Sequence, residues 1–155
     1  MRAVTLLIVD DEQENRENLA ALLKREGWNS LLAESGEAGL KILKEHPEVD
    51  FLITDLKMPG MSGLELLEAA RILRPELPRI LVTAYGTIED TVKAMKVGAF
   101  DVISKPLKIK ILKELILSKI QIKDQSFHDL KAQGLISASY LALTDTLKRS
   151  AASNA

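Results

Sequence analysis

The chain has 155 residues, of which 46% are hydrophobic and 28% charged, and this composition suffices for one ordinary domain with a proper core. A formal net charge of −1 gives no sign of a nucleic-acid-binding surface, and the lack of cysteine excludes disulfides, thiol chemistry and cysteine zinc sites. No run reaches the ~20 apolar residues of a membrane helix, and the first residues predict a strand rather than a signal peptide, so a cytoplasmic location is expected.

Apolar runs alternate with amphipathic stretches along most of the chain. Continuous apolar runs predict strands, and apolar residues at helical spacing predict helices. In chain order, the sequence predicts a strand over 4–9, a helix over 14–26, a strand over 30–33, a helix capped by Ser35, a strand over 49–54, a helix over 63–73, a strand over 79–83, a helix over 87–99, a strand over 101–104 and a helix from Lys108 onward. Leu19, Leu22 and Leu23 are expected on the inner face of the first helix.

This alternation predicts an α/β fold, with a five-stranded parallel sheet that is doubly wound, meaning covered by helices on both faces. The pattern changes near residue 121. Residues 121–155 keep leucines at helical spacing but contain no predicted strand, and they end in the small-residue stretch KRSAASNA. We therefore expect a domain over residues 1–120, followed over 121–155 by a helical extension or linker with a frayed tail.

Polar residues stand at the carboxyl ends of the predicted strands, where open parallel sheets bind ligands. They are Asp10 and Asp11 after the first strand, Asp55 at the third, Thr83 at the fourth, and Ser104, Lys105 and Pro106 at the fifth. Three close carboxylates need a counter-charge, and a site built from oxygen ligands favours Mg²⁺. Lys105 and Thr83 can bind phosphate oxygens, while Asp55 can attack phosphorus and form an aspartyl phosphate.

Four segments, LLIVDDE, FLITDLKMPGMSG, LVTAYG and GAFDVISKP, resemble the receiver domains of response regulators in two-component signalling. The resemblance covers roughly residues 4–120 and implies a flavodoxin-like sheet with strand order 2-1-3-4-5. The roles that it implies are phosphoacceptor for Asp55, Mg²⁺ ligand for Asp10, Asp11, Asp55 and the carbonyl of Lys57, switch hydroxyl for Thr83, and phosphate contact for Lys105. It also implies a cis Lys105–Pro106 peptide bond.

One position departs from the family pattern. Val102 stands where many receivers carry a tyrosine or phenylalanine whose ring swings inward on activation. Because valine has no ring to swing, we expect switching to depend on Thr83 and the fourth helix. Tyr85, two residues after Thr83, and Lys57 are candidates for tuning the hydrolysis of the aspartyl phosphate. His128, in SFHDLK, faintly resembles the phosphorylated-histidine box of sensor kinases, but the usual proline is absent and a surface histidine is expected.

The leading functional expectation is a signalling switch rather than a metabolic enzyme. It would accept a phosphoryl group from a histidine kinase, and this would change the face with which it binds a partner or dimerises. That face would extend over the fourth and fifth helices, or it would lie on the C-terminal helix. A Mg²⁺-dependent phosphatase would need an aspartate two residues after the nucleophile, where Lys57 stands. A docking module that is never phosphorylated is the other alternative.

The output of the switch is left open by the sequence. The segment VTAYGTIEDTVKAMKVGAFDVISKP resembles receivers of enhancer-binding transcription activators or hybrid histidine kinases. No ATPase motif or helix-turn-helix follows it, and direct nucleic-acid binding by this chain is not expected. A membrane partner is not expected either. The chain is expected to be either a receiver fragment of a larger protein of that kind or a stand-alone regulator.

Overall fold

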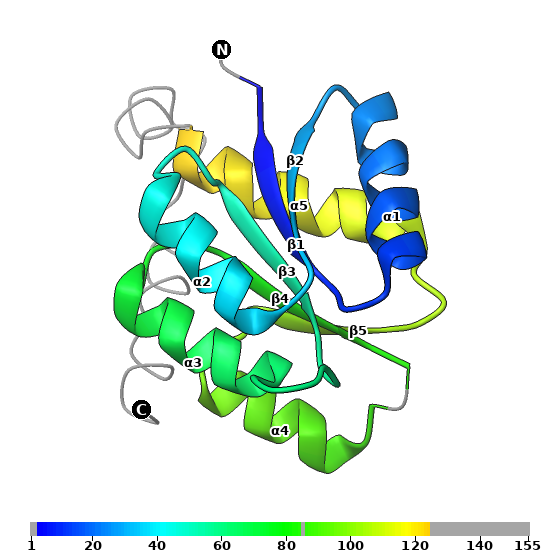
Figure 1. The fold of residues 1–155 in the computed structure, drawn as a ribbon. Coiled ribbons are helices and arrows are strands. Elements are labelled where there is room, and N and C mark those ends of the chain that lie inside the picture. The colour runs from blue at the N-terminus through cyan, green and yellow to red at the C-terminus, as the bar shows by residue number, and fades with distance from the viewer. Residues whose placement is uncertain (1–2, 85, 125–155) are drawn as a thin grey trace, which may run out of the picture. The chain divides into compact units, whose positions relative to one another are not determined.

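A computed structural model describes residues 3–84 and 86–124, which form alternating strands and helices (Figure 1). The strands are β1 (Thr5–Val9), β2 (Asn29–Ala33), β3 (Phe51–Asp55), β4 (Arg79–Thr83) and β5 (Asp101–Ser104). The helices are α1 (Gln13–Arg25), α2 (Gly36–Glu45), α3 (Gly63–Leu73), α4 (Ile88–Lys96) and α5 (Ile109–Asp124). Tyr85, His128 and the helically spaced leucines that follow His128 lie outside the described residues.

The chain divides into two compact units, Met1–Ile109 and Lys110–Ala155. The first unit contains the whole sheet, whose strands are all parallel and lie in the order β2-β1-β3-β4-β5. This order confirms the predicted flavodoxin-like topology. In the register, Asp55 lies beside Val82, and Thr83 lies beside Ser104. The carboxyl ends of these strands therefore meet at one edge of the sheet.

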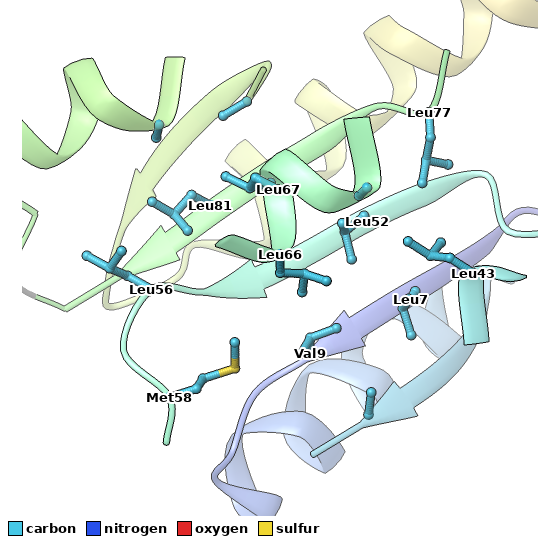
Figure 2. Packing of buried hydrophobic residues seen from close by; sticks show 14 of the residues in the cluster. Leu7, Val9, Leu43, Leu52, Leu56, Met58, Leu66, Leu67, Leu77 and Leu81 are labelled. Carbon is cyan, nitrogen blue, oxygen red and sulfur yellow. The ribbon is translucent and has the colours of Figure 1, made fainter. Parts of the chain in front are cut away.

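The larger part of the core lies between the sheet and helices α2 and α3 (Figure 2). Branched and long apolar side chains from the strands meet leucines from the two helices, and each buried side chain of this size stabilises the fold by about 1.5–3 kcal/mol. The fully buried members include Leu7, Leu52, Leu66, Leu67, Leu77 and Leu81. Because side chains alternate along a strand, Leu6, Ile8 and Ile53 point to the opposite face, where α1 packs.

Helix α1 covers that second face with Leu19 and Leu23, which are buried. The prediction that Leu22 would share this inner position is wrong, because its side chain is 36% exposed. Successive residues of a helix are turned by about 100°, so Leu22 and Leu23 cannot both point at the sheet. Leu23 takes the central position and Leu22 lies at the margin of the helix.

Two boundaries differ from the prediction by more than one residue. The third strand begins at Phe51 rather than residue 49 and includes Asp55 as its last residue. The fourth helix ends at Lys96, and Gly98 follows with a φ of 97°. The predicted helix caps are confirmed, because the side chains of Ser35 and Thr87 accept hydrogen bonds from the amides of Ala38 and Asp90.

Most of α5 belongs to the second unit. Its buried side chains among the described residues are Leu112 and Ile116, which lie four residues apart and so share one face of the helix. Within the described parts of the chain, no helix has the length and apolar content that crossing a bilayer requires.

Candidate functional site

Three carboxylates gather at the carboxyl edge of the sheet. Asp10 follows β1 and is buried, Asp55 ends β3, and Asp11 is exposed beside them. One oxygen from each carboxylate can be chosen so that the three atoms lie within 4.8 Å of one another. The predicted convergence of Asp10, Asp11 and Asp55 is therefore present in the structure.

Lys105 supplies the positive charge next to this cluster. Its Nζ lies 3.3 Å from Asp55 Oδ2, to which it donates a hydrogen bond, and 3.6 Å from Asp10 Oδ2. The residue follows β5, and the peptide bond between Lys105 and Pro106 is cis, as the resemblance implied. One ammonium thus lies against two of the three carboxylates.

The backbone fixes both carboxylates that contact Lys105. The amide of Leu56 donates to Asp55 Oδ1 at 2.8 Å, and the amide of Glu12 donates to Asp10 Oδ1 at 2.9 Å. In each side chain, Oδ1 is therefore held by the main chain while Oδ2 faces Lys105. The acids are oriented before any ligand arrives.

The electrostatics of the cluster favour protons or cations. Burial raises the pKa of Asp55, whose side chain is only 13% exposed; Lys105 opposes this shift and Asp10 adds to it. Burial lowers the pKa of Lys105, but attraction by Asp55 and Asp10 outweighs it, so this pKa is raised as well. Both shifts reflect burial combined with two carboxylates, Asp10 and Asp55, that share one ammonium. With Asp11 beside them, the cluster has an excess of negative charge.

A hard divalent cation fits this donor set. Ligands of one Mg²⁺ at about 2.1 Å lie at most about 4.2 Å apart, so the spacing within the acid cluster is close to that of a shared cation. The cluster offers oxygen donors alone, and its excess negative charge needs a partner. Lys57, two residues beyond Asp55, is exposed in the following loop, and the role of its carbonyl as a further ligand stays a prediction.

Thr83 and Lys105 are linked through the main chain. Thr83 ends β4 and is buried, and its carbonyl accepts a hydrogen bond of 2.8 Å from the amide of Lys105. This bond continues the pairing of β4 with β5 beyond Ser104. The two residues predicted to bind phosphate oxygens therefore belong to one continuous edge of the sheet.

A close approach of the backbone explains why glycine follows the loop after β3. A Cβ atom on Gly63 would lie 2.0 Å from the carbonyl oxygen of Asp55 and 2.9 Å from the Cα of Leu56. The amide of Gly63 also donates to the Leu56 carbonyl at 2.8 Å. The start of α3 is thus in direct contact with the backbone of the candidate phosphoacceptor.

Two side chains that support the site escaped the sequence analysis. Arg16 of α1 donates from Nη1 to the carbonyl of Asp10 at 2.6 Å, and Glu37 of α2 accepts from the amide of Met61 at 3.1 Å. Arg16 resembles any charged residue on a surface helix, and Glu37 resembles an ordinary acid in a first helical turn. Neither pattern indicates a partner so far away in sequence.

The position that departs from the family pattern lies in the wall of the core. Val102 is partly buried and packs against the cluster formed by the sheet, α2 and α3. Tyr85, the other residue predicted to tune the site, lies outside the described residues. The described part of the site therefore contains Thr83 but no ring at position 102.

Comparisons with known proteins agree with this arrangement. Residues 6–117 match the response regulator receiver domain. An NtrX-like response regulator of Rickettsia bellii is 39% identical over 138 residues, which are 86% of this chain and 28% of that protein. The transcriptional regulatory protein FixJ of Rhizobium meliloti is 40% identical over 118 residues, which are 75% of this chain and 56% of FixJ. The chain thus spans less than two thirds of these relatives.

Solved structures show the same fold. A response regulator receiver domain protein from Clostridium thermocellum superimposes with a TM-score of 0.74 at 34% identity, covering 77% of this chain and 96% of that one. The structure of FixJ-N gives a TM-score of 0.66 at 38% identity, covering 77% of this chain and 94% of that one. With the match extending from the first strand into the last helix, the chain belongs to the response regulator receiver domain family of two-component signalling.

Proposed function

We propose that this receiver domain is a switch that is turned on by Mg²⁺-dependent phosphorylation of Asp55. The observation that carries the proposal is the position of Asp55, which shares one ammonium with Asp10 and lies in one carboxylate cluster with Asp10 and Asp11. A turn-capping aspartate would need neither the lysine nor the other two acids.

Each residue has a stated part in the transfer. An oxygen of Asp55 attacks phosphorus, and an O–P bond forms as the P–N bond of a phosphohistidine breaks, leaving the electron pair on the imidazole nitrogen. Lys105 and the Thr83 hydroxyl bind phosphoryl oxygens. Asp10, Asp11, Asp55 and the Lys57 carbonyl would hold Mg²⁺, which would supply positive charge against the phosphoryl oxygens. Hydrolysis of the O–P bond by water resets the switch and releases phosphate.

The phosphoryl donor is proposed to be a histidine kinase in the cytoplasm. The receiver promotes its own phosphorylation and dephosphorylation, and it has no metabolic substrate. Lys57 supports this reading against an aspartate-dependent phosphatase, because a lysine stands where that chemistry needs a second acid.

The output surface is proposed to include α4. Ile88, Val92 and Met95 are exposed on this helix, and their spacing of four and three residues places them on one face. Apolar side chains gathered in this way suit a partner or a second copy of the domain. Phosphorylation would favour the arrangement of α4 that binds, with Thr83 rather than an aromatic residue at position 102 as the trigger.

Intact mass spectrometry after incubation with acetyl phosphate tests the proposal. Wild type with Mg²⁺ is expected to gain one phosphoryl group, while Asp55→Asn and wild type in EDTA are expected to gain none. A metal-dependent gain that also persists in Asp55→Asn would place the modification elsewhere. No gain by wild type at any Mg²⁺ concentration would refute the phosphoacceptor assignment and favour a docking module that is never phosphorylated.

A further inference from the structure

The loop after β3, residues 56–62, carries the Lys57 carbonyl that the proposed function assigns to Mg²⁺. The core fixes the first part of this loop, because the side chains of Leu56 and Met58 on either side of Lys57 are buried. The tip of the loop, at Gly60 and Met61, is held less deeply, because Gly60 is exposed and the Met61 side chain is only partly buried against the core. What holds the tip therefore bears on how well the carbonyl is positioned.

Glu37 contacts this tip from the neighbouring helix. Its Oε1 accepts a hydrogen bond of 3.1 Å from the Met61 amide, a contact that spans 24 residues of sequence. Gly60 adopts a φ of 77°, and a Cβ atom there would lie 3.0 Å from the same oxygen. The conformation of the tip thus brings the backbone close against the Glu37 carboxylate.

Helix α2 is itself well anchored, by a cap at its start and by a buried leucine in its second half. Glu37 lies in its first turn, next to Ser35, whose side chain caps the helix by accepting from the Ala38 amide. Leu43 of the same helix is buried in the core. A carboxylate on this fixed helix can therefore restrain the backbone of the loop at Met61.

We infer that Glu37 is a positioning residue for Mg²⁺ binding, which acts by holding the loop that carries the Lys57 carbonyl. The inference rests on the proposed function. A loop that is already ordered loses less conformational entropy when its carbonyl becomes a ligand, so the cation binds more tightly. Glu37 itself touches the main chain of the loop and is not among the proposed ligands.

The carboxylate could instead act through its charge, and a matched set of variants separates the two effects. Glu37→Gln keeps an oxygen that accepts from Met61 but loses the charge. Glu37→Ala loses both. Ser35→Ala weakens the start of α2 while leaving the Glu37–Met61 bond in place, and it controls for loss of helix stability.

Isothermal titration of the metal-free domain with MgCl₂ is the main measurement. Glu37→Ala is expected to bind Mg²⁺ about two- to tenfold more weakly than wild type, the range for one hydrogen bond, whereas Glu37→Gln and Ser35→Ala bind as wild type. Hydrogen exchange of the Met61 amide should be faster in Glu37→Ala alone. With acetyl phosphate, Glu37→Ala should need more Mg²⁺ for half-maximal phosphorylation but reach the same rate at saturation.

Three results would overturn the inference while leaving the proposed function intact. They are an unchanged Mg²⁺ affinity in Glu37→Ala, an equal loss in Glu37→Gln, which would indicate an effect of charge, and an equal loss in Ser35→Ala, which would indicate general loosening of α2. Failure of wild type itself to bind Mg²⁺ would instead refute the proposed function and the inference with it.

Discussion

At the scale of single residues, the chain holds Asp55 where its charged form is disfavoured. Burial and the neighbouring Asp10 raise the pKa of this carboxyl, and Lys105 offsets the shift only in part. Such an arrangement costs stability in the absence of ligand. The same excess of negative charge favours the binding of a divalent cation.

The cost can be measured with Asp55→Asn in metal-free buffer. The folded wild type binds its Asp55 proton more tightly than the unfolded chain does, so its stability falls as pH rises from the unfolded pKa of 3.8 through the raised folded pKa. The asparagine lacks this penalty. At pH 7 we expect the variant to be more stable than wild type, by on the order of 1 kcal/mol.

Urea unfolding in EDTA at several pH values checks this expectation. The advantage of Asp55→Asn should fade as the pH is lowered through the raised folded pKa, and it should be lost below 3.8, where the wild-type carboxyl becomes protonated in both states. Asp101→Asn is the control, because Asp101 is exposed on β5 and its bond to the Val102 amide survives in asparagine. A pH-independent difference between Asp55→Asn and wild type would contradict the assignment of the charge penalty to Asp55.

Gly63 carries a second prediction at this scale. A methyl group at this position would lie 2.0 Å from the Asp55 carbonyl oxygen, so either the end of β3 or the start of α3 must move. We expect Gly63→Ala to lower the free energy of unfolding by about 1–3 kcal/mol. We also expect its rate of phosphorylation by acetyl phosphate to be lower than the rate of a variant that is equally destabilised elsewhere.

Ser62→Ala provides the comparison for Gly63→Ala. The Ser62 side chain caps α3 by accepting a hydrogen bond from the Glu65 amide. Its removal should lower the free energy of unfolding by about 1 kcal/mol and creates no clash at Asp55. Phosphorylation rates are compared at a temperature where both variants are folded. Equal rates would show that the approach of Gly63 to Asp55 matters for stability alone.

At the scale of elements, Arg79 at the start of β4 joins two turns at the opposite edge of the sheet. Its guanidinium donates to the carbonyls of Arg74 and Pro75 in the turn before β4, and to that of Gly98 in the turn after α4. The Phe100 ring lies 5.5 Å from its centre. One side chain therefore fixes the C-terminal end of the helix that we propose as the output surface.

Replacing Arg79 should loosen this end of α4. The side chain is 3% exposed, and in Arg79→Met three carbonyls lose a charged donor. We expect a loss of about 2–4 kcal/mol in urea unfolding. Arg71→Met is the control, since its bond to the Lys96 carbonyl is long, at 3.5 Å, and solvent-exposed, and it should cost less than 1 kcal/mol or so. Equal losses would argue against Arg79 as a specific anchor.

At the scale of the whole molecule, the sequence predicted the structure correctly wherever a local pattern of residues is compatible with a single arrangement. Short runs such as RILVT and DVIS predicted strands with the bounds that the structure has, and parallel strands bring Asp10, Asp55 and Lys105 to one edge. Strand order came from the family resemblance, because periodicity does not determine which strands are neighbours.

Side-chain contacts between residues far apart in the sequence could not be predicted in this way. The hydrogen bonds between Glu37 and Met61 and between Arg79 and Gly98 depend on how helices and loops pack against one another in the folded domain. In the sequence, Glu37, Met61 and Gly98 resemble ordinary helix-surface or turn residues, and Arg79 resembles any first residue of a strand. Leu22 failed for a related reason, since an apolar residue at the margin of a helix gives the same local signal as a buried one.

Binding of Mg²⁺ should stabilise the whole domain through the acid cluster. A ligand that binds only the folded state adds about 2.7 kcal/mol at a hundred times its Kd. For a domain of this size, each kcal/mol raises Tm by about 2–4 °C, so saturating MgCl₂ is expected to raise Tm by several degrees. Asp10→Asn combined with Asp11→Asn should abolish this rise, because neutral side chains no longer supply the charge that holds the cation.

The comparison isolates the cluster because asparagine at position 10 can still accept from the Glu12 amide. Glu89→Gln controls for loss of a surface acid, since Glu89 is exposed on α4 and pairs with Lys93 at 3.2 Å. It should respond to MgCl₂ as wild type does, and NaCl at matched ionic strength should raise none of the Tm values to this extent. An Mg²⁺-dependent rise that survives in the Asp10 and Asp11 double variant would mean that the cation binds elsewhere on the domain.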